Sequence, residues 1–225
     1  MNVLVIIATL NEEEGIGPTI VEVQQSLYNP HILIVDGRST DRTVEISKDM
    51  GAEVMIQKGT GKGDAIFQAI QHADLDNARY VAFIDGDYTY PASFLPEMIN
   101  ILENDPHIGM VCGDRFVHNL DLGKLHKLLF IGNRAIAFMH NLLNGVKLHD
   151  PLTGLRVTKA EVLKGWKPRS KGFDIEVELN KWVKRKGYAI AEVPIKYRKR
   201  LGEKKLKIRH GLIILKRILL EILPR

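Results

Sequence analysis

Acidic residues follow short apolar runs at several places in the first 90 residues, and such residues can bind a cation. The clearest case is Asp85-Gly86-Asp87, directly after the apolar run 80–84. Two carboxylates one residue apart repel each other unless a cation lies beside them, and Mg²⁺ and Mn²⁺ prefer oxygen ligands that they share with phosphates. A simple Asp-Gly turn is the alternative. The position after a buried run favours a Mg²⁺ or Mn²⁺ site with Asp85 and Asp87 as ligands.

Asp36 occupies the same kind of position after the apolar run 31–35 and precedes Gly37, Ser39 and Asp41. A carboxylate there can accept hydrogen bonds from a nucleobase or a ribose. An Asx turn explains part of the pattern, and a helix cap explains Asp41 fully. We therefore expect Asp36 to bind a ligand and Asp41 to be structural.

A glycine-rich stretch at 59–63 contains Lys62 and superficially matches a phosphate-binding loop. The P-loop pattern needs four residues between its first glycine and Gly-Lys-Ser/Thr, and Asp64 follows here, so that class is excluded. Lys62 begins a predicted helix, where it could contact a phosphate or be an ordinary surface lysine. The eight histidines show no His-x-x-x-His spacing, and we assign them no ligand role.

The elements that must position these residues alternate between strand and helix. Strands are expected at 2–8, 31–35, 52–56 and 80–84, with helices at 16–27, after 39–41 and at 62–73. This order predicts the α/β class, with a Rossmann-like, mostly parallel sheet and helices on both faces. Ligands bind at the carboxyl ends of such strands, so the acidic residues should gather at one edge.

The second half of the chain is less regular. We expect helices at 122–143 and 174–186 and strands at 155–158 and 189–197. A final helix at 204–223 has apolar and basic faces. These patterns divide the chain into a main domain, 1–203, and a C-terminal amphipathic helix, 204–225. On the helix at 174–186, Glu176 and Glu178 could orient a bound substrate or pair with Lys181.

Charge is distributed unevenly along the 225 residues. The last 45 residues hold 15 of the 32 Lys and Arg but 3 of the 27 Asp and Glu, so they carry +12 while residues 1–180 carry −7. A basic end favours an anionic partner, such as nucleic acid, a phosphorylated substrate or a membrane surface. The single cysteine, Cys112, excludes an internal disulfide, and no apolar stretch approaches about 20 residues. The N-terminus has no signal-peptide pattern, so we expect a cytoplasmic protein.

Taken in order, the motifs resemble the inverting glycosyltransferases of family 2, and later segments are similar to its polyprenyl-phosphate sugar synthases, typified by dolichyl-phosphate mannose and glucose synthases. The resemblance covers about residues 1–210. It is carried by these segments: Ala8–Glu13, Val35–Thr43, Gly61–Gly63, Asp85–Asp87, Gly113–Arg115, Asn133–Arg134, Asp150–Arg156, Gly172–Glu176 and Arg200–Leu206.

The resemblance implies a GT-A fold that binds a GDP- or UDP-sugar. It places the nucleoside against Thr9, Asn11, Glu12 and Asp36, and the ribose or sugar near Asp85. Asp87 would ligate the metal that bridges the diphosphate and neutralises charge on the leaving group. Asp150 matches a position suspected as a catalytic base, although an Asp-Pro turn would also explain it.

The implied acceptor is a polyprenyl phosphate, which is already an anionic nucleophile because phosphate monoesters have a second pKa of about 6. Such an acceptor needs cationic clamps more than a base. The candidates are Arg115, Arg134, Arg156, Arg200 and Lys205.

The helix at 204–223 suits the interface of an anionic membrane because it combines an apolar face with basic residues. We expect peripheral attachment to the cytoplasmic face of a membrane, although a helix packed on the core or on a second copy of the chain fits the same pattern. Two other functions stay open: transfer to a soluble or saccharide acceptor, and a basic nucleic-acid-binding module. The acidic body argues against the latter, so we expect no nucleic-acid partner.

Overall fold

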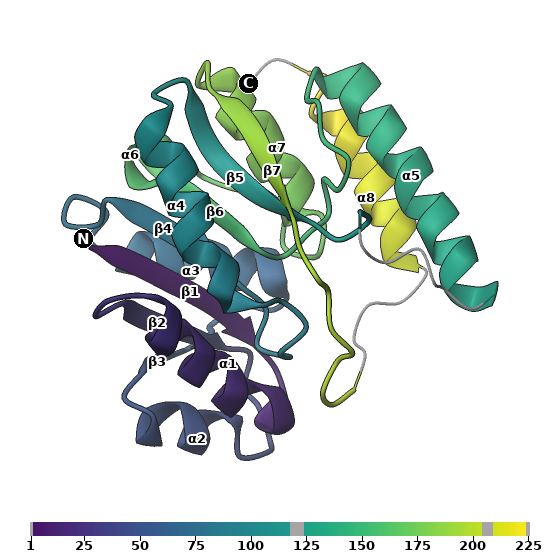
Figure 1. The fold of residues 1–225 in the computed structure, drawn as a ribbon. Coiled ribbons are helices and arrows are strands. Elements are labelled where there is room, and N and C mark those ends of the chain that lie inside the picture. The colour runs from purple at the N-terminus through teal and green to yellow at the C-terminus, as the bar shows by residue number, and fades with distance from the viewer. Residues whose placement is uncertain (1, 118–123, 204–208, 224–225) are drawn as a thin grey trace.

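The computed structural model describes residues 2–117, 124–203 and 209–223. Its helices and strands alternate as expected in the first half of the chain (Figure 1). In chain order they are β1 Val3–Thr9, α1 Glu13–Ser26, β2 His31–Asp36, α2 Thr43–Asp49, β3 Glu53–Ile56, α3 Lys62–His72, β4 Tyr80–Phe83, a short 3₁₀ helix Ala92–Phe94, α4 Leu95–Asn104, β5 Ile108–Asp114, α5 Lys124–Asn144, β6 Arg156–Lys159, α6 Ala160–Leu163, α7 Ile175–Arg185, β7 Ala189–Pro194 and α8 Arg209–Leu220.

Seven strands form one sheet in the order β3-β2-β1-β4-β6-β5-β7. The pairs β1–β2, β1–β4, β2–β3 and β5–β7 are parallel, whereas β6 runs antiparallel to both β4 and β5. The expected α/β class with a mostly parallel sheet is confirmed. Since β6 reverses direction, β4 and β5 end at the same edge as β1 and β2.

Alternate residues of β1 point into two separate cores, as the two-residue period of a strand requires. One core contains Val3, Val5 and Ile7 and packs against α1 and α4. The other contains Leu4 and Ile6 and packs against α3, α6 and α7. Both faces of the sheet are therefore covered, which explains why β1 is continuously apolar.

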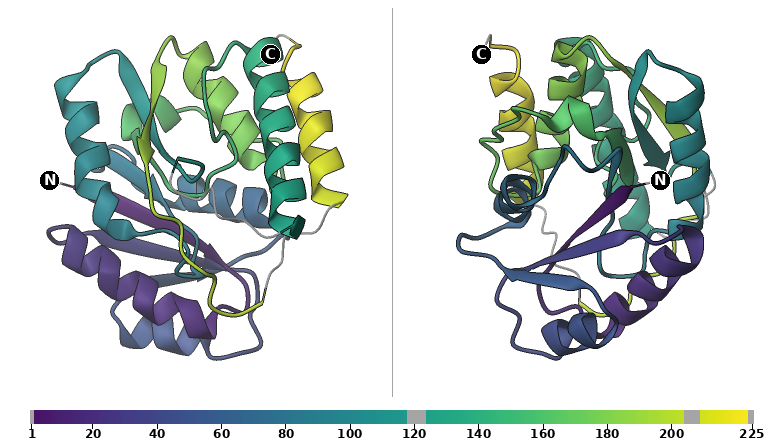
Figure 2. Two further views of the ribbon diagram at one scale, coloured as in Figure 1. Left: turned by 45° about the vertical axis from the view of Figure 1, so that its right-hand side comes forward. Right: turned by 90° about the vertical axis from the view of Figure 1, so that its left-hand side faces the viewer.

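A third, smaller core joins α7 to the last helix. Val177 of α7 packs with Ile214 and Ile218 of α8, and Ile136 and Leu143 of α5 lie against them. The two views in Figure 2 show α5 and α8 side by side along one flank of the molecule. One face of α8 thus packs on the domain, which is the alternative that the sequence left open for this helix.

The opposite face of α8 and part of α5 carry exposed apolar side chains. These are Phe138 and Leu142 of α5, Leu212, Ile213, Leu219 and Leu220 of α8, and Ile222 and Leu223 just beyond it. We call this set the α5–α8 apolar surface. Within the described residues, none of the helices has the combination of length and apolarity needed to cross a bilayer.

Polar contacts fasten α8 to α7. The Nε of Arg217 lies 2.8 Å from Oδ2 of Asp174, and Arg185 of α7 pairs with Glu221 at 2.9 Å. Glu178 accepts hydrogen bonds from the backbone N–H groups of Arg169 and Ser170. The position of α8 is therefore fixed by charge as well as by apolar packing.

Candidate active site

The turn that carries Asp85 and Asp87 lies at the carboxyl end of β4, beside the ends of β1 and β2. Helix α1 crosses this turn so closely that a Cβ atom added to Gly15 would lie 2.6 Å from the carbonyl oxygen of Gly86. Tyr88, the next residue, has φ of +63°, a conformation that costs energy for a residue with a side chain. Close packing against a glycine thus determines where the two carboxylates lie.

Asp87 is buried and has two kinds of partner. Its Oδ1 accepts hydrogen bonds from the backbone N–H of Thr89 at 3.1 Å and from the Thr89 hydroxyl at 2.6 Å. Its Oδ2 pairs with the guanidinium of Arg200, which also pairs with Glu12. Burial and the nearby Asp85 carboxylate raise the pKa of Asp87. The structure thus brings Glu12, Asp87 and Arg200 together, although 188 residues separate the first from the last.

The segment that carries Arg200 is held across the Asp87 turn by its backbone. The N–H of Arg198 donates to the carbonyl of Thr89 at 2.9 Å, and the N–H of Leu201 donates to the carbonyl of Asp87 at 3.2 Å. The Arg198 guanidinium lies over the Tyr88 ring and pairs with Glu22. Arg198 and Thr89 are partners of the site that sequence reasoning missed, since no motif connected them to the acidic turn.

Lys62 contacts carboxylates in this structure. Its Nζ lies 2.7 Å from Oδ1 of Asp85 and 2.7 Å from Oε1 of Glu176. These two acids raise the pKa of Lys62 despite its burial, so the side chain stays charged. Glu176 therefore pairs with Lys62 and not with Lys181, whose Nζ donates to the carbonyl of Asn144. The amine orients Asp85.

The glycines around Lys62 explain this pairing. A Cβ atom on Gly63 would lie 2.4 Å from the carbonyl oxygen of Ser170, and Gly61 has φ of +90°. The segment that precedes α7 can approach α3 only because these positions have no side chains. The glycine-rich stretch is thus a packing motif that brings Glu176 to the site.

Thr9, Asn11 and Asp36 form a connected hydrogen-bonded group at the ends of β1 and β2. The Thr9 hydroxyl donates to Asp36 at 3.2 Å, and Asp36 also accepts the N–H of Ser39 at 2.8 Å. The amide oxygen of Asn11 accepts the N–H of Thr40 at 2.8 Å. Asp36 is fully buried, so its carboxylate shapes the loop that follows β2.

Arg115 and Asp150 form a largely buried ion pair. Oδ2 of Asp150 lies 2.5 Å from Nε of Arg115, and Oδ1 lies 2.7 Å from its Nη2. The Arg115 guanidinium also lies over the ring of Tyr197, which packs edge-on against Tyr90. Both oxygens of the expected base are therefore occupied by an arginine that was expected to bind phosphate.

Arg156 lies in the interior with 2% of its surface exposed. It donates to the carbonyls of Thr153 at 2.9 Å and Pro151 at 2.7 Å, and to the side chain of Asn180. These contacts hold the loop before β6 and leave the guanidinium away from any open surface. Among the other expected clamps, Arg134 is exposed on α5, and Lys205 lies outside the described residues.

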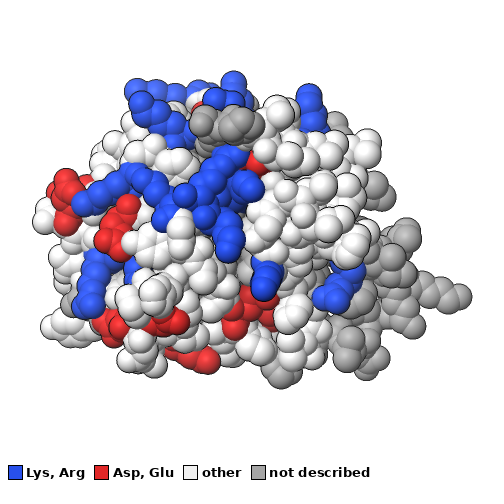
Figure 3. Space-filling view, turned by 90° about the horizontal axis from the view of Figure 1, so that it is seen from above, with Lys and Arg blue, Asp and Glu red and all other residues white. Residues whose placement is uncertain are grey.

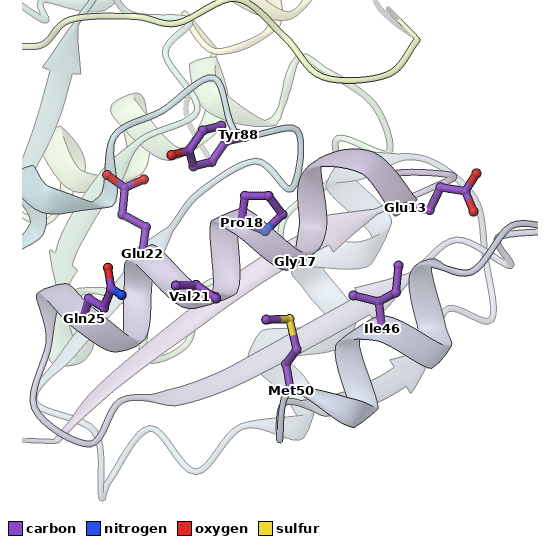
Figure 4. Close-up of a pocket in the computed structure, with 9 residues that line it drawn as sticks. All are labelled: Glu13, Gly17, Pro18, Val21, Glu22, Gln25, Ile46, Met50 and Tyr88. Carbon is purple, nitrogen blue, oxygen red and sulfur yellow. The ribbon is translucent and has the colours of Figure 1, made fainter.

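A hollow in the described structure lies beside the Arg198 contacts, because Glu22 and Tyr88 are among the residues that line it. It has a volume of about 650 Å³, lies between α1 and α2, and reaches Tyr88 (Figure 4). Its walls combine Pro18, Val21, Ile46 and Met50 with the carboxylates of Glu13 and Glu22. The two carboxylates of the acidic turn are in contact with Arg200 and Lys62.

Comparison with known proteins identifies the class. Residues 4–166 match the model of the family described as glycosyl transferase family 2. A dolichyl-phosphate hexose transferase of Haloferax volcanii is 35% identical over 90% of this chain and 85% of its own length. Glycosyltransferase AglJ of the same organism is 34% identical over 87% of this chain, which spans 62% of that relative. The chain belongs to glycosyl transferase family 2 and is a glycosyltransferase, as the motif order indicated.

Solved structures confirm the GT-A type of fold. Glucosyl-3-phosphoglycerate synthase from Mycobacterium tuberculosis, crystallised with Mn²⁺, UDP-glucose and phosphoglyceric acid, covers all of this chain and 81% of its own, with a TM-score of 0.78 and 21% identity. The same enzyme with Mg²⁺ and UDP gives a TM-score of 0.78 at 20% identity. These structures show the fold of this chain, and the assignments of its residues to a metal and a nucleotide stay predictions.

Proposed function

We propose that this glycosyltransferase moves a sugar from a nucleotide-sugar to a polyprenyl phosphate, with inversion at the anomeric carbon. The main support is the acidic turn at the end of β4. Its Asp87 pairs with the guanidinium of Arg200, which also pairs with Glu12. A cationic group already lies against these carboxylates, so the donor set fits a hard divalent cation. The UDP-glucose and Mn²⁺ named for the structural neighbour support a nucleotide-sugar and a metal here.

In this proposal Asp87, with Asp85 beside it, holds Mg²⁺ or Mn²⁺. When bound, the ion neutralises the negative charge that develops on the departing nucleoside diphosphate. Lys62 and Glu176 keep Asp85 in place, while Thr9, Asn11, Glu12 and Asp36 shape the loops that receive the nucleoside. Arg200 releases Asp87 and Glu12 and binds phosphate in their place, because its charge suits either partner.

The acceptor phosphate supplies its own negative charge, so the reaction requires no proton abstraction from it. We therefore assign Asp150 and Arg156 to positioning: Asp150 holds Arg115, and Arg156 holds the preceding loop. Arg115 and Arg200 are the described cations best placed for phosphate.

The lipid part of the acceptor is supported by the α5–α8 apolar surface and by the name of the dolichyl-phosphate hexose transferase relative. This surface is connected to the site through α7. Asp174, just before α7, pairs with Arg217 of α8, and Glu176, two residues further along the chain, pairs with Lys62. We propose that α5 and α8 attach the enzyme peripherally to the cytoplasmic face of an anionic membrane.

The experiment is a transfer assay with labelled UDP- and GDP-sugars, polyprenyl phosphate and Mn²⁺. We expect label in the organic phase and an inverted anomeric configuration by NMR. Label on a soluble phosphorylated acceptor instead, such as phosphoglycerate, would favour the soluble-acceptor alternative. No lipid-linked sugar with any common donor would contradict the proposal.

A further inference from the structure

Three side chains with metal-binding atoms converge at the end of β5, away from the acidic turn. Asp114 is the last residue of β5, Glu192 lies on the neighbouring β7, and His149 lies in the loop after α5. Glu192 is paired in register with Cys112, two residues before Asp114, so both carboxylates project from the same face of the sheet. Their ligand atoms and the His149 ring nitrogen all lie within 4.8 Å of one another.

The Asp114 carboxylate is buried and that of Glu192 is largely so, while the imidazole is accessible. Asp114 is 2% exposed and the side chain of Glu192 is 11% exposed, against 72% for that of His149. Oδ1 of Asp114 accepts the N–H of Phe116 at 2.8 Å, and its Oδ2 faces Nδ1 of His149 at 3.5 Å. Nδ1 also lies 3.4 Å from Oε2 of Glu192. One imidazole nitrogen thus faces two largely buried acidic oxygens and lies beyond ordinary hydrogen-bond distance from both.

These distances match those between neighbouring ligand atoms of a tetrahedral metal site. With Zn–N and Zn–O bonds of about 2.0–2.1 Å, neighbouring ligand atoms of a tetrahedral site lie about 3.3–3.4 Å apart. The observed distances from His149 Nδ1, 3.4 Å to Glu192 and 3.5 Å to Asp114, are close to this value. A bound ion would draw the two carboxylates together. One imidazole with two carboxylates is a donor set that Zn²⁺ and similar transition metals accept.

We propose that Asp114, His149 and Glu192 bind a divalent transition metal, with Zn²⁺ as the best fit and a water as the fourth ligand. This site is distinct from the one assigned to Asp87, and it does not depend on the sugar-transfer proposal. Its role is positional. Both Glu192 oxygens accept the N–H of His149, and Oε1 also accepts that of Asp150, so an ion here fixes the residue that holds Arg115.

Electrostatics support the geometry. Burial and the nearby Asp114 carboxylate raise the pKa of Glu192 above its usual value, although backbone N–H groups partly offset them. A cation between the two acids would remove this repulsion. Sequence reasoning missed the site because its ligands are 35 and 43 residues apart and no histidine pair marks them.

The test is a Co²⁺ titration of tag-free, chelator-treated protein carrying Asp87→Asn, which removes one of the two carboxylates assigned to the other metal site and so weakens that site. We expect one equivalent of Co²⁺ to produce the visible absorption bands of tetrahedral coordination, and one equivalent of Zn²⁺ to abolish them. Adding His149→Ala or Glu192→Gln should eliminate the bands. The matched control, His107→Ala, removes an exposed histidine outside the cluster and should retain them.

Two results would overturn the proposal. One is the absence of stoichiometric Co²⁺ and Zn²⁺ binding in the Asp87→Asn protein. The other is an unchanged spectrum after His149→Ala, which would place the bound ion elsewhere, for example near His31, Glu53 and His72. Because the His149 side chain is exposed, its substitution leaves folding intact, and thermal unfolding of the metal-free variants checks this.

Discussion

Arg200 neutralises two carboxylates that the sequence assigns to donor binding. Its guanidinium contacts Glu12 and Asp87, with 23% of its side chain exposed. Removing it leaves two largely buried acids without a counter-charge, which costs far more than an exposed pair would. The residue therefore stabilises these two acids, and in the proposed reaction it moves when a cation takes over its role.

Arg200→Gln tests this exchange. We expect the free energy of unfolding to fall by about 1–3 kcal/mol without metal, because the acids lose their partner. Added Mn²⁺ should restore stability and raise the Tm more in the variant than in the wild type. The measurement is thermal unfolding with and without Mn²⁺, and an equal Mn²⁺ shift in both proteins would argue against cation exchange at this site.

Asp87→Asn tests the metal assignment with little change in shape. The side chain can still accept the Thr89 hydrogen bonds, but it loses the charge that attracts a divalent ion. We expect kcat to fall by about 10²–10³-fold, the size typical of losing one charge-stabilising group. Asp49→Asn, an exposed carboxylate on α2, is the matched control for the transfer assay. Full activity of Asp87→Asn would refute the metal role.

Helix α1 acts on the site through a glycine contact. Gly15→Ala would place a methyl group 2.6 Å from the carbonyl oxygen of Gly86, so the acidic turn must shift. We expect a stability loss of about 1–3 kcal/mol by urea unfolding and a larger proportional loss of transfer rate. Gly17→Ala on the same helix is the control, because its Cβ meets a side chain at an ordinary 3.5 Å. Equal behaviour of the two variants would show that the contact does not position the turn.

The junction of α5, α7 and α8 contains a buried histidine. His140 lies between the side chains of Asn144 and Asn180, and Asn144 donates to the carbonyl of Ile218 on α8. Burial, with Arg156 and Lys181 nearby, lowers the pKa of His140 to about 3. The neutral ring is therefore part of the folded structure, whereas the unfolded chain takes up a proton near pH 6.5.

Stability should consequently fall as the pH drops from about 6.5 toward 3, by about 1.4 kcal/mol per unit, because only the unfolded state is protonated in that range. We expect His140→Gln to flatten this slope in urea unfolding between about pH 6 and pH 4. His107→Gln, at an exposed histidine, should retain the wild-type slope. Parallel slopes for wild type and His140→Gln would contradict the assignment.

At the scale of the whole molecule, the basic residues near the C-terminus lie in several different parts of the structure. The sequence alone does not distinguish these parts. Arg198 and Arg200 reach the acidic turn, and Arg217 holds α8. Lys184 and Arg185 lie in the last turn of α7, at the amino ends of β5 and β7, on a face where Figure 3 shows a band of basic side chains. The net charge of the tail therefore does not measure its attraction for a membrane.

Vesicle flotation tests the α5–α8 apolar surface directly. Leu212 and Leu219 are 73% and 53% exposed on α8, so Leu212→Glu with Leu219→Glu adds charge without disturbing the core. We expect the wild type to float with anionic phosphatidylglycerol vesicles and the double variant to remain in solution. Tyr28→Glu is the control, because Tyr28 is 92% exposed and lies far from α8 in the sequence. Equal flotation of all three proteins would separate α8 from membrane attachment.

The sequence determined the class of fold and the motifs of the site because both depend on local patterns. Continuous apolar strands such as β1 require cover on both faces, and acidic residues at strand ends must meet at one edge. Asp85 and Asp87 were found in this way. The elements α4 and β5 were not predicted.

Only the tertiary structure decided which charges meet. For Lys62 a phosphate contact and an ordinary surface position were both open, and it pairs with Asp85 and Glu176. Asp150 was a candidate base or part of an Asp-Pro turn, and it holds Arg115. The same structure joins Glu12 to Arg200 and brings together Asp114, His149 and Glu192. The free energy of an ion pair or a metal site depends on distances of a few ångströms and on burial. Those quantities are set by the packing of elements far apart in the chain, which no local pattern contains.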